Sequence, residues 1–188
     1  MHTPLETMTE TVGFDEQTRS LYSLDAMSER EKGSVLAQLF AYWEALPPGW
    51  HGLPNIKDCQ PKLALPRNIA EQVCCLDTSA ENPLNYIVRE HATSTIPGFG
   101  TELVGRPLCD RPELDMDTTA CAVEFLYCKR ERTAMYHEIE QILGGLRRHY
   151  TRIIVPVEDD SGEVCRIYFA MRELQPAKRV TFRVIGDS

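Results

Sequence analysis

Several features that mark common classes of protein are missing from this chain of 188 residues. There is no run of about 18 apolar residues, so the sequence predicts no transmembrane helix. The N-terminus carries Glu6, Glu10, Asp15 and Glu16 but no early lysine and no apolar block, which is unlike a secretory signal peptide. We therefore expect a protein that neither spans a membrane nor carries such a signal.

A surplus of basic residues is also missing. The 20 Lys and Arg residues are outnumbered by 28 Asp and Glu residues, which gives a formal net charge of −8. Proteins that bind nucleic acids need positive charge against the phosphates, so this composition argues against nucleic-acid binding. Arg147, Arg148, His149 and Arg152 form a local basic cluster, but aromatic residues are not interleaved in the way that stacking of bases requires, so it suggests a solvated strand. Docking of an acidic partner there stays open.

The cysteines lack regular spacing. There are seven, and none forms the Cys-x-x-Cys motif of a metal site or of attached haem. With no signal peptide, this pattern predicts reduced thiols in the cytoplasm. Cys74 and Cys75 lie in a predicted strand and should point to opposite faces, as buried small residues rather than as a redox site. Cys121 and Cys128 are predicted to share an apolar helix face with Phe125.

No catalytic set can be recognised. The sequence contains no Gly-x-Ser-x-Gly motif, no paired carboxylates in an apolar context and no order of Cys and His that specifies a nucleophile. The five histidines also lack the i, i+4 spacing of a helical zinc site. The sequence therefore favours a binding protein over an enzyme, and it predicts no particular cofactor or metal.

The pattern of apolar residues predicts both helices and strands. Ser28 and Glu31 have the spacing of a capping box, and the apolar residues after them predict a helix over residues 28–46. A second helix is expected over residues 117–133. Five strands are predicted, at residues 72–77, 84–90, 136–143, 148–157 and 164–172. Their short connections favour an α+β fold: a five-stranded antiparallel sheet with helices on one face and a capping helix at the N-terminus.

A set of short motifs follows this order of elements. They are Tyr42-Trp43, Leu53-Pro54, Leu65-Pro66, Leu76-Asp77, Tyr86-Ile87-Val88-Arg89 and Phe99-Gly100-Thr101-Glu102-Leu103-Val104-Gly105-Arg106. With two strands, short helices, a connecting helix and three strands, residues 36–174 resemble the PAS domain family. The motifs resemble most a proteobacterial subset that begins with an aromatic Tyr-Trp helix. The chain departs from this subset at Glu90-His91-Ala92, where a glycine-threonine pair is usual.

The resemblance implies how the chain is organised and what it does. Residues 1–26 would be a loose acidic arm, residues 27–174 a PAS-like domain with its N-terminal helix, and residues 175–188 a tail. The chain would be a stand-alone cytoplasmic sensor or signalling module that binds a small molecule or a protein partner. Two other hypotheses are an enzyme or carrier that uses the cavity of a cone-shaped α+β fold, and a sensor that binds haem or flavin.

The ligand pocket is expected between the sheet and the helix at residues 117–133. Its predicted lining residues are Tyr86, Val88, Phe125, Ile139 and Phe169. Two histidines, His91 and His137, should lie near strand ends that border the pocket. Either could bind haem iron or an acidic ligand, although a solvated or hydrogen-bonded histidine is commoner.

A homodimer is expected through the helix at residues 28–46. This helix carries more apolar surface than one cap needs, and the flank around Leu36, Phe40 and Trp43 would be exposed in a monomer. Helices that precede the first strand often form dimers in the family that the chain resembles. The alternative is a monomer in which the helix folds fully onto its own core.

Overall fold

The structure is a computed structural model that describes residues 2–12, 15–92, 103–110 and 116–180. A single seven-stranded sheet runs through it, and every strand pair is antiparallel. The strand order across the sheet is β1 (Glu6–Val12), β2 (Asp15–Tyr22), β5 (Met135–Leu143), β6 (Leu146–Glu158), β7 (Val164–Arg179), β3 (Val73–Asp77) and β4 (Ile87–Glu90).

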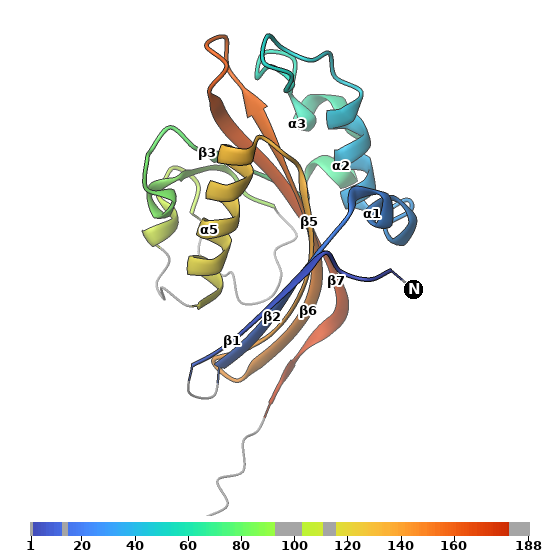
Figure 1. Ribbon diagram of the computed structural model, residues 1–188, viewed down its shortest axis with the longest axis vertical. Helices are drawn as coiled ribbons and strands as arrows, with labels where there is room; N and C mark the ends of the chain where they lie inside the picture. Colours follow the sequence, from blue (N-terminus) through green and yellow to red (C-terminus); the bar gives the residue numbers. More distant parts are fainter. Residues whose placement is uncertain (1, 13–14, 93–102, 111–115, 181–188) are drawn as a thin grey trace, which may run out of the picture.

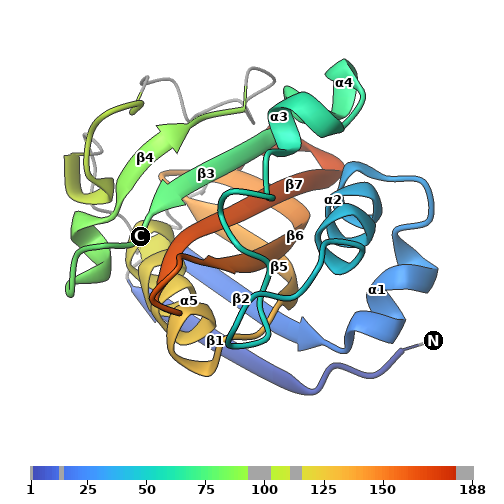
Figure 2. The same cartoon turned by 90° about the horizontal axis from the view of Figure 1, so that it is seen from above.

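Helices cover both faces of this sheet (Figures 1 and 2). On one face lies α5 (Met116–Glu131), and on the other lie α1 (Leu24–Arg30) and α2 (Val35–Glu44). The short helices are α3 (Pro61–Ala64), α4 (Arg67–Ala70), η1 (Pro83–Asn85) and η2 (Leu108–Asp110). The predicted α+β class agrees with this arrangement, but helices on one face only were expected, and that prediction is wrong.

The prediction of five strands is also wrong, because the expected loose arm forms the hairpin β1–β2. β1 pairs with β2 over seven residues, and β2 pairs with β5 from Glu16↔Ile142 to Tyr22↔Tyr136. Every residue of β1 is exposed, so the strand has no apolar face that a pattern search could detect. This acidic segment is ordered because β2 pairs with β5, which lies more than 110 residues later in the sequence. At the other end of the chain, β7 continues to Arg179, five residues into the expected tail.

The helix predicted over residues 28–46 is two helices. Ser23 caps α1 and Ser34 caps α2, and between the helices Gly33 has φ +78°, a left-handed conformation that glycine adopts readily. Ser28 lies inside α1 and donates to the Leu24 carbonyl at 3.1 Å, so it is not a cap. The predicted capping box is therefore wrong, and Glu31 is buried in the protein instead.

The core has one large apolar cluster on each side of the sheet. The cluster below α2 includes Leu36, Leu39 and Phe40, and the cluster below α5 includes Leu76 and Phe125. Because Leu36 and Phe40 are buried within the chain, the exposed flank on which the dimer prediction depended is not present. Trp43 is half-buried, and its indole Nε1 donates to the Pro156 carbonyl at 2.7 Å.

Most of the other predicted elements are confirmed. The strands expected at residues 72–77, 136–143, 148–157 and 164–172 correspond to β3, β5, β6 and β7, and the helix at 117–133 corresponds to α5. The strand expected at 84–90 is shorter, because Pro83 begins the 3-10 helix η1 and β4 starts only at Ile87. The first part of the Phe99–Arg106 motif lies outside the described residues.

Candidate functional site

A pocket lies between α5 and the part of the sheet formed by β3, β4, β6 and β7. Its volume is about 580 Å³, which includes space at its open mouth. Most of the wall is apolar and comes from the sheet, from α5, and from η2 with the segment that leads into it: Leu76, Val88, Leu103, Leu108, Phe125, Phe169 and Met171. A mainly apolar pocket with a few polar groups is the usual form of a small-molecule site.

Four of the seven residues predicted for the ligand site line this pocket, namely Val88, His91, Phe125 and Phe169. Phe125 of α5 and Phe169 of β7 pack against each other with ring centroids 5.2 Å apart. The sheet brings Val88 and Phe169 together because β3 pairs with both β4 and β7. His91 follows β4 at the pocket wall, and its Nδ1 lies 3.0 Å from the Ala92 carbonyl oxygen.

The other three predicted residues lie outside the pocket wall. Tyr86 is fully buried in the apolar cluster below α5, with the Lys129 ammonium 5.7 Å from its ring centroid. Ile139 is also fully buried and packs against Tyr150, further along the sheet. His137 lines a second groove, between the β1–β2 hairpin and α5, so the two histidines do not share a cavity.

Four paired charged residues lie at the polar end of the pocket, and we call them the arginine cluster: Arg19, Asp117, Glu124 and Arg152. Asp117 and Arg152 line the pocket itself, whereas Arg19 and Glu124 line the second groove. Arg19 of β2 pairs with Asp117 and, at 2.9 Å, with Glu124, both on α5. Arg152 of β6 also pairs with Glu124. Only 3% of Arg19 and 1% of Arg152 are exposed, so the four charges are removed almost completely from water. Buried charges persist only when they are paired in this way.

Cys121 and Tyr150 extend the arginine cluster into the pocket wall. Arg152 Nη1 donates to Cys121 Sγ at 2.8 Å, and Tyr150 Oη donates to Asp117 Oδ1 at 3.2 Å. Burial raises the pKa of Tyr150, and the Asp117 carboxylate raises it further, so the phenol is protonated at neutral pH. For Arg19, burial alone lowers the pKa, but Cys121, Tyr150 and Asp117 more than offset this effect and the pKa is raised.

His137 lies beside the arginine cluster and is neutral. Its Nε2 is 3.6 Å from Glu124 Oε1, a separation at which an ion pair is possible. Burial nevertheless lowers the pKa of His137 to about 3, with a further contribution from the positive charge of Arg19. Glu124 already faces two guanidinium groups, so it has little negative charge left to stabilise an imidazolium.

The charges of the arginine cluster balance, because two arginines face two carboxylates and His137 adds none at pH 7. The hydrogen bonds do not balance: Arg152 Nε has no partner, although the side chain lines the pocket. A buried donor without an acceptor costs about 1–3 kcal/mol. A ligand with an acceptor group could recover part of that free energy, since its apolar body would face the rest of the wall.

Most of this polar end is not predicted by the residue pattern. That pattern predicts Arg152 and Arg148 in a solvated strand, but they are 1% and 8% exposed. Cys121 packs against the apolar cluster that contains Phe125 and Cys128, as predicted, but it is only half-buried and its Sγ also accepts from Arg152. One signal was available: Arg148, Tyr150 and Arg152 alternate on one face of β6, directly opposite Gln141, Ile139 and His137 of β5.

Metal chemistry finds no support in the described residues, where no three candidate ligand side chains come together. All seven cysteines are free thiols. No helix among the described elements is both long and apolar enough to cross a bilayer. A comparison with protein-family models, curated proteins and solved structures found no match to this chain.

Proposed function

We propose that the chain is a PAS-type sensor module of the cytoplasm, and that its pocket binds a small, mainly apolar molecule with one hydrogen-bond acceptor. The observation that carries this proposal is the apolar pocket beside α5, whose polar end contains Arg152 with its Nε unpaired. The order of β3, β4, α5, β5, β6 and β7 along the chain also supports the PAS resemblance.

The charge balance of the arginine cluster favours a neutral acceptor, such as a carbonyl oxygen. A carboxylate would add a third negative charge to two positive charges in a buried region, and a protonated amine cannot accept a hydrogen bond from Arg152. The ligand would act as a signal if it bound two conformations of the module with different affinities. The α5 helix contributes to both the apolar wall and the polar end, so its position relative to the sheet would respond to the ligand.

Four small aromatic probes of similar size test the proposal: acetophenone, benzoate, benzylamine and ethylbenzene. We expect acetophenone to bind best, as measured by changes in the NMR spectrum and by an increase in Tm. At a concentration of tenfold Kd, a ligand stabilises the folded state by about 1.4 kcal/mol. Binding of none of the four probes, or tighter binding of benzylamine than of acetophenone, would contradict the proposal.

A pocket-filling variant locates the binding. Leu103 is 4% exposed and lines the pocket, so Leu103→Phe should reduce its volume and weaken acetophenone binding by tenfold or more. Leu63 is 82% exposed and remote from the pocket wall, so Leu63→Phe makes a matched control that should bind like the unmodified protein. Equal weakening in both variants would place the binding elsewhere.

A further inference from the structure

The two edges of the sheet are protected differently. At the β4 edge, the chain covers itself: Gly105 N donates to the Val88 carbonyl at 2.8 Å, and Val88 N donates to the Arg106 carbonyl at 3.0 Å. Ile87 also forms an isolated bridge with Pro107. At the β1 edge, no segment of the described chain pairs with the outer side of the strand. One edge is therefore closed, and the other presents its backbone groups to solvent.

The open edge has few of the devices by which proteins usually prevent strand pairing. Such edges are commonly short, interrupted by a bulge, or protected by proline or by charged residues, lysine above all. β1 is seven residues long, its register with β2 shows no shift from Glu6 to Val12, and it contains neither lysine nor proline. Its only charged residues are Glu6 and Glu10. This edge is therefore open to another strand, and it carries only negative charge.

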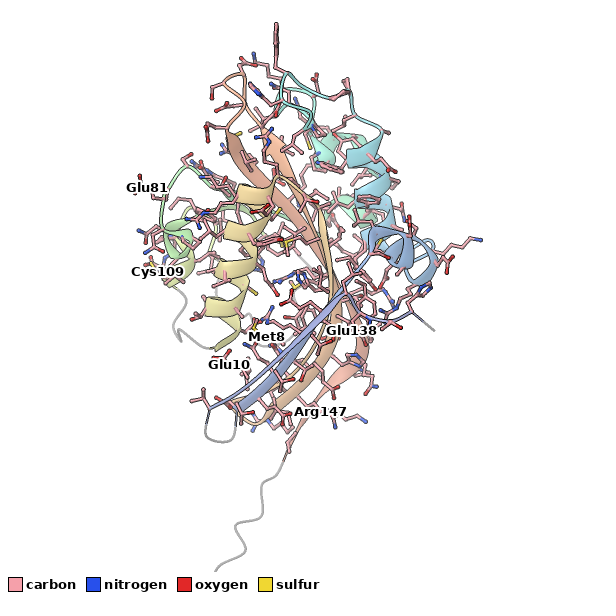
Figure 3. All side chains as sticks on the ribbon, in the orientation of Figure 1. Met8, Glu10, Glu81, Cys109, Glu138 and Arg147 are labelled. Atoms are coloured by element: carbon pink, nitrogen blue, oxygen red, sulfur yellow. The ribbon has the colours of Figure 1, made fainter. Side chains whose placement is uncertain are left out.

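The α5 side of β1 combines those two carboxylates with apolar surface. Glu6, Met8 and Glu10 alternate along this face, and Figure 3 shows Met8 and Glu10 on the side of the hairpin toward α5. Met8 is 54% exposed and borders a groove of about 570 Å³ that also includes Val123 and Tyr127 of α5. Val123 and Tyr127 are 58% and 51% exposed, so three large apolar side chains meet solvent there.

We propose that β1 is a docking strand for an extended segment of another protein. Over five consecutive residues, that segment has basic residues at positions 1 and 5 and an apolar residue at position 3, while positions 2 and 4 can be any residue. In an added antiparallel strand, residues two positions apart share a face. The apolar residue would lie opposite Met8, and the two basic residues would lie opposite Glu6 and Glu10. Main-chain hydrogen bonds to β1 would provide the affinity and the side-chain pairs the selectivity.

A second copy of this chain is a poorer occupant of the same edge. An antiparallel pair of β1 strands that keeps both Met8 side chains on one face also places four glutamates there, and like charges across strands destabilise the pairing. Each copy also has a net charge of −8, which opposes their association. Charge complementarity therefore favours a basic partner.

The test uses the intact protein and a fluorescein-labelled peptide, Thr-Lys-Thr-Val-Thr-Lys-Thr, with Thr-Glu-Thr-Val-Thr-Glu-Thr as its acidic counterpart. Fluorescence anisotropy should show binding of the basic peptide only. The E6K/E10K variant should bind the basic peptide about tenfold or more weakly and should bind the acidic peptide instead. The E44K/E81K variant changes two exposed glutamates outside β1, has the same net charge, and should bind like the unmodified protein.

Hydrogen exchange adds a readout of backbone pairing. The basic peptide should slow amide exchange within β1 and leave β4 unchanged, because only the open edge gains hydrogen bonds. Equal loss of binding in E6K/E10K and E44K/E81K would show general charge attraction and overturn the proposal. Binding of the basic peptide without added protection in β1 would also overturn the proposal. The same holds if light scattering shows that the protein alone is a dimer and its β1 amides are already protected. None of these readouts depends on the pocket, so failure here leaves the proposed ligand site untouched.

Discussion

Two buried polar clusters lie on opposite faces of the same strands, and they differ in how completely their hydrogen bonds are made. On the α1 side, Glu31 accepts from Tyr136 at 2.8 Å, from Thr151 at 2.8 Å, and from Arg172 at 2.6 and 3.0 Å. We call this set the Glu31 cluster. Both carboxylate oxygens of Glu31 are thus occupied, as is usual for a buried charge with a structural role.

The arginine cluster on the α5 side contains more charge and leaves polar atoms unsatisfied. Arg152 Nε has no hydrogen-bond partner, nor has Nδ1 of the adjacent His137. Both of its arginines are almost fully buried, whereas the side chain of Arg172 in the Glu31 cluster is 38% exposed. A pocket adjoins the arginine cluster, lined by Asp117 and Arg152. Incomplete pairing beside a cavity is what we expect of a binding site, and complete pairing is what we expect of a structural contact.

The largest predicted effect concerns Arg19→Met, which removes the cation shared by Asp117 and Glu124. Leaving a buried carboxylate without its partner costs about 3–5 kcal/mol, so we expect a loss of that size in the free energy of unfolding, measured by urea titration. Arg89→Met is the control, because Arg89 is half exposed and Asp77 keeps Arg166 at 2.9 Å as a second cation, so we expect a loss of only about 1 kcal/mol. Similar losses in the two variants would mean that burial does not distinguish these ion pairs.

A smaller loss in the free energy of unfolding is expected for Glu31→Gln in the Glu31 cluster. The amide keeps one acceptor oxygen but replaces the other with donors, so the charged hydrogen bonds from Arg172 are lost, at a cost of about 2 kcal/mol. Arg172 can then turn toward water, a relaxation that Asp117 and Glu124 lack when Arg19 is removed. A urea titration in which Glu31→Gln cost more than Arg19→Met would reverse our ranking of the two clusters.

The smallest effect is a pH dependence from His137, which faces Arg19 of β2, Glu124 of α5 and, across the strand pair, Arg152 of β6. Its pKa is about 3 in the folded protein and about 6.5 ordinarily, so below pH 6.5 the unfolded chain binds a proton that the folded chain does not. The contribution of His137 to the free energy of unfolding is therefore complete above pH 6.5, and it is lost as the pH is lowered toward 3.

Between pH 6.5 and 5.5 this loss should amount to about 1 kcal/mol in urea titrations. His137→Asn should show a flatter profile over the same interval. The Glu31 cluster gives a separate dependence, because burial raises the pKa of Glu31 but the hydrogen bonds from Arg172, Thr151 and Tyr136 lower it more. That stability is lost only below the ordinary carboxyl pKa of about 4.5. A profile for His137→Asn as steep as that of the unmodified protein would contradict the assignment.

The central strands could be predicted because each has a local signal. In β7, the apolar residues Cys165, Ile167, Phe169 and Met171 recur at every second position and share one face, and this alternation is visible in the sequence alone. β1 has no such signal, since all its residues are exposed and its order comes from pairing with β2. The break between α1 and α2 had a signal in Gly33, a residue type that often ends a helix, but the apolar residues on its C-terminal side favour one continuous helix.

The apolar wall of the pocket was predictable for the same reason, and its polar end was not. Phe125 and Phe169 belong to apolar faces that local spacing identifies. Arginines are ordinarily exposed, and the alternation of Arg148, Tyr150 and Arg152 indicates only that they share a face of one strand, not that this face is buried. Its partner Glu124 and the covering helix α5 lie elsewhere in the chain.

The central strands, the helix α5 and the apolar residues that meet beneath it follow from the sequence, because they depend on spacing along a few turns or strand residues. Which charges are buried and which edge is open depends on contacts between distant parts of the chain. Arg19 and Asp117 are separated by 98 residues, and they pair because β2 joins the edge of β5 below α5. The free-energy cost of burying a charge depends on such distant partners, so it cannot be predicted from the spacing of neighbouring residues.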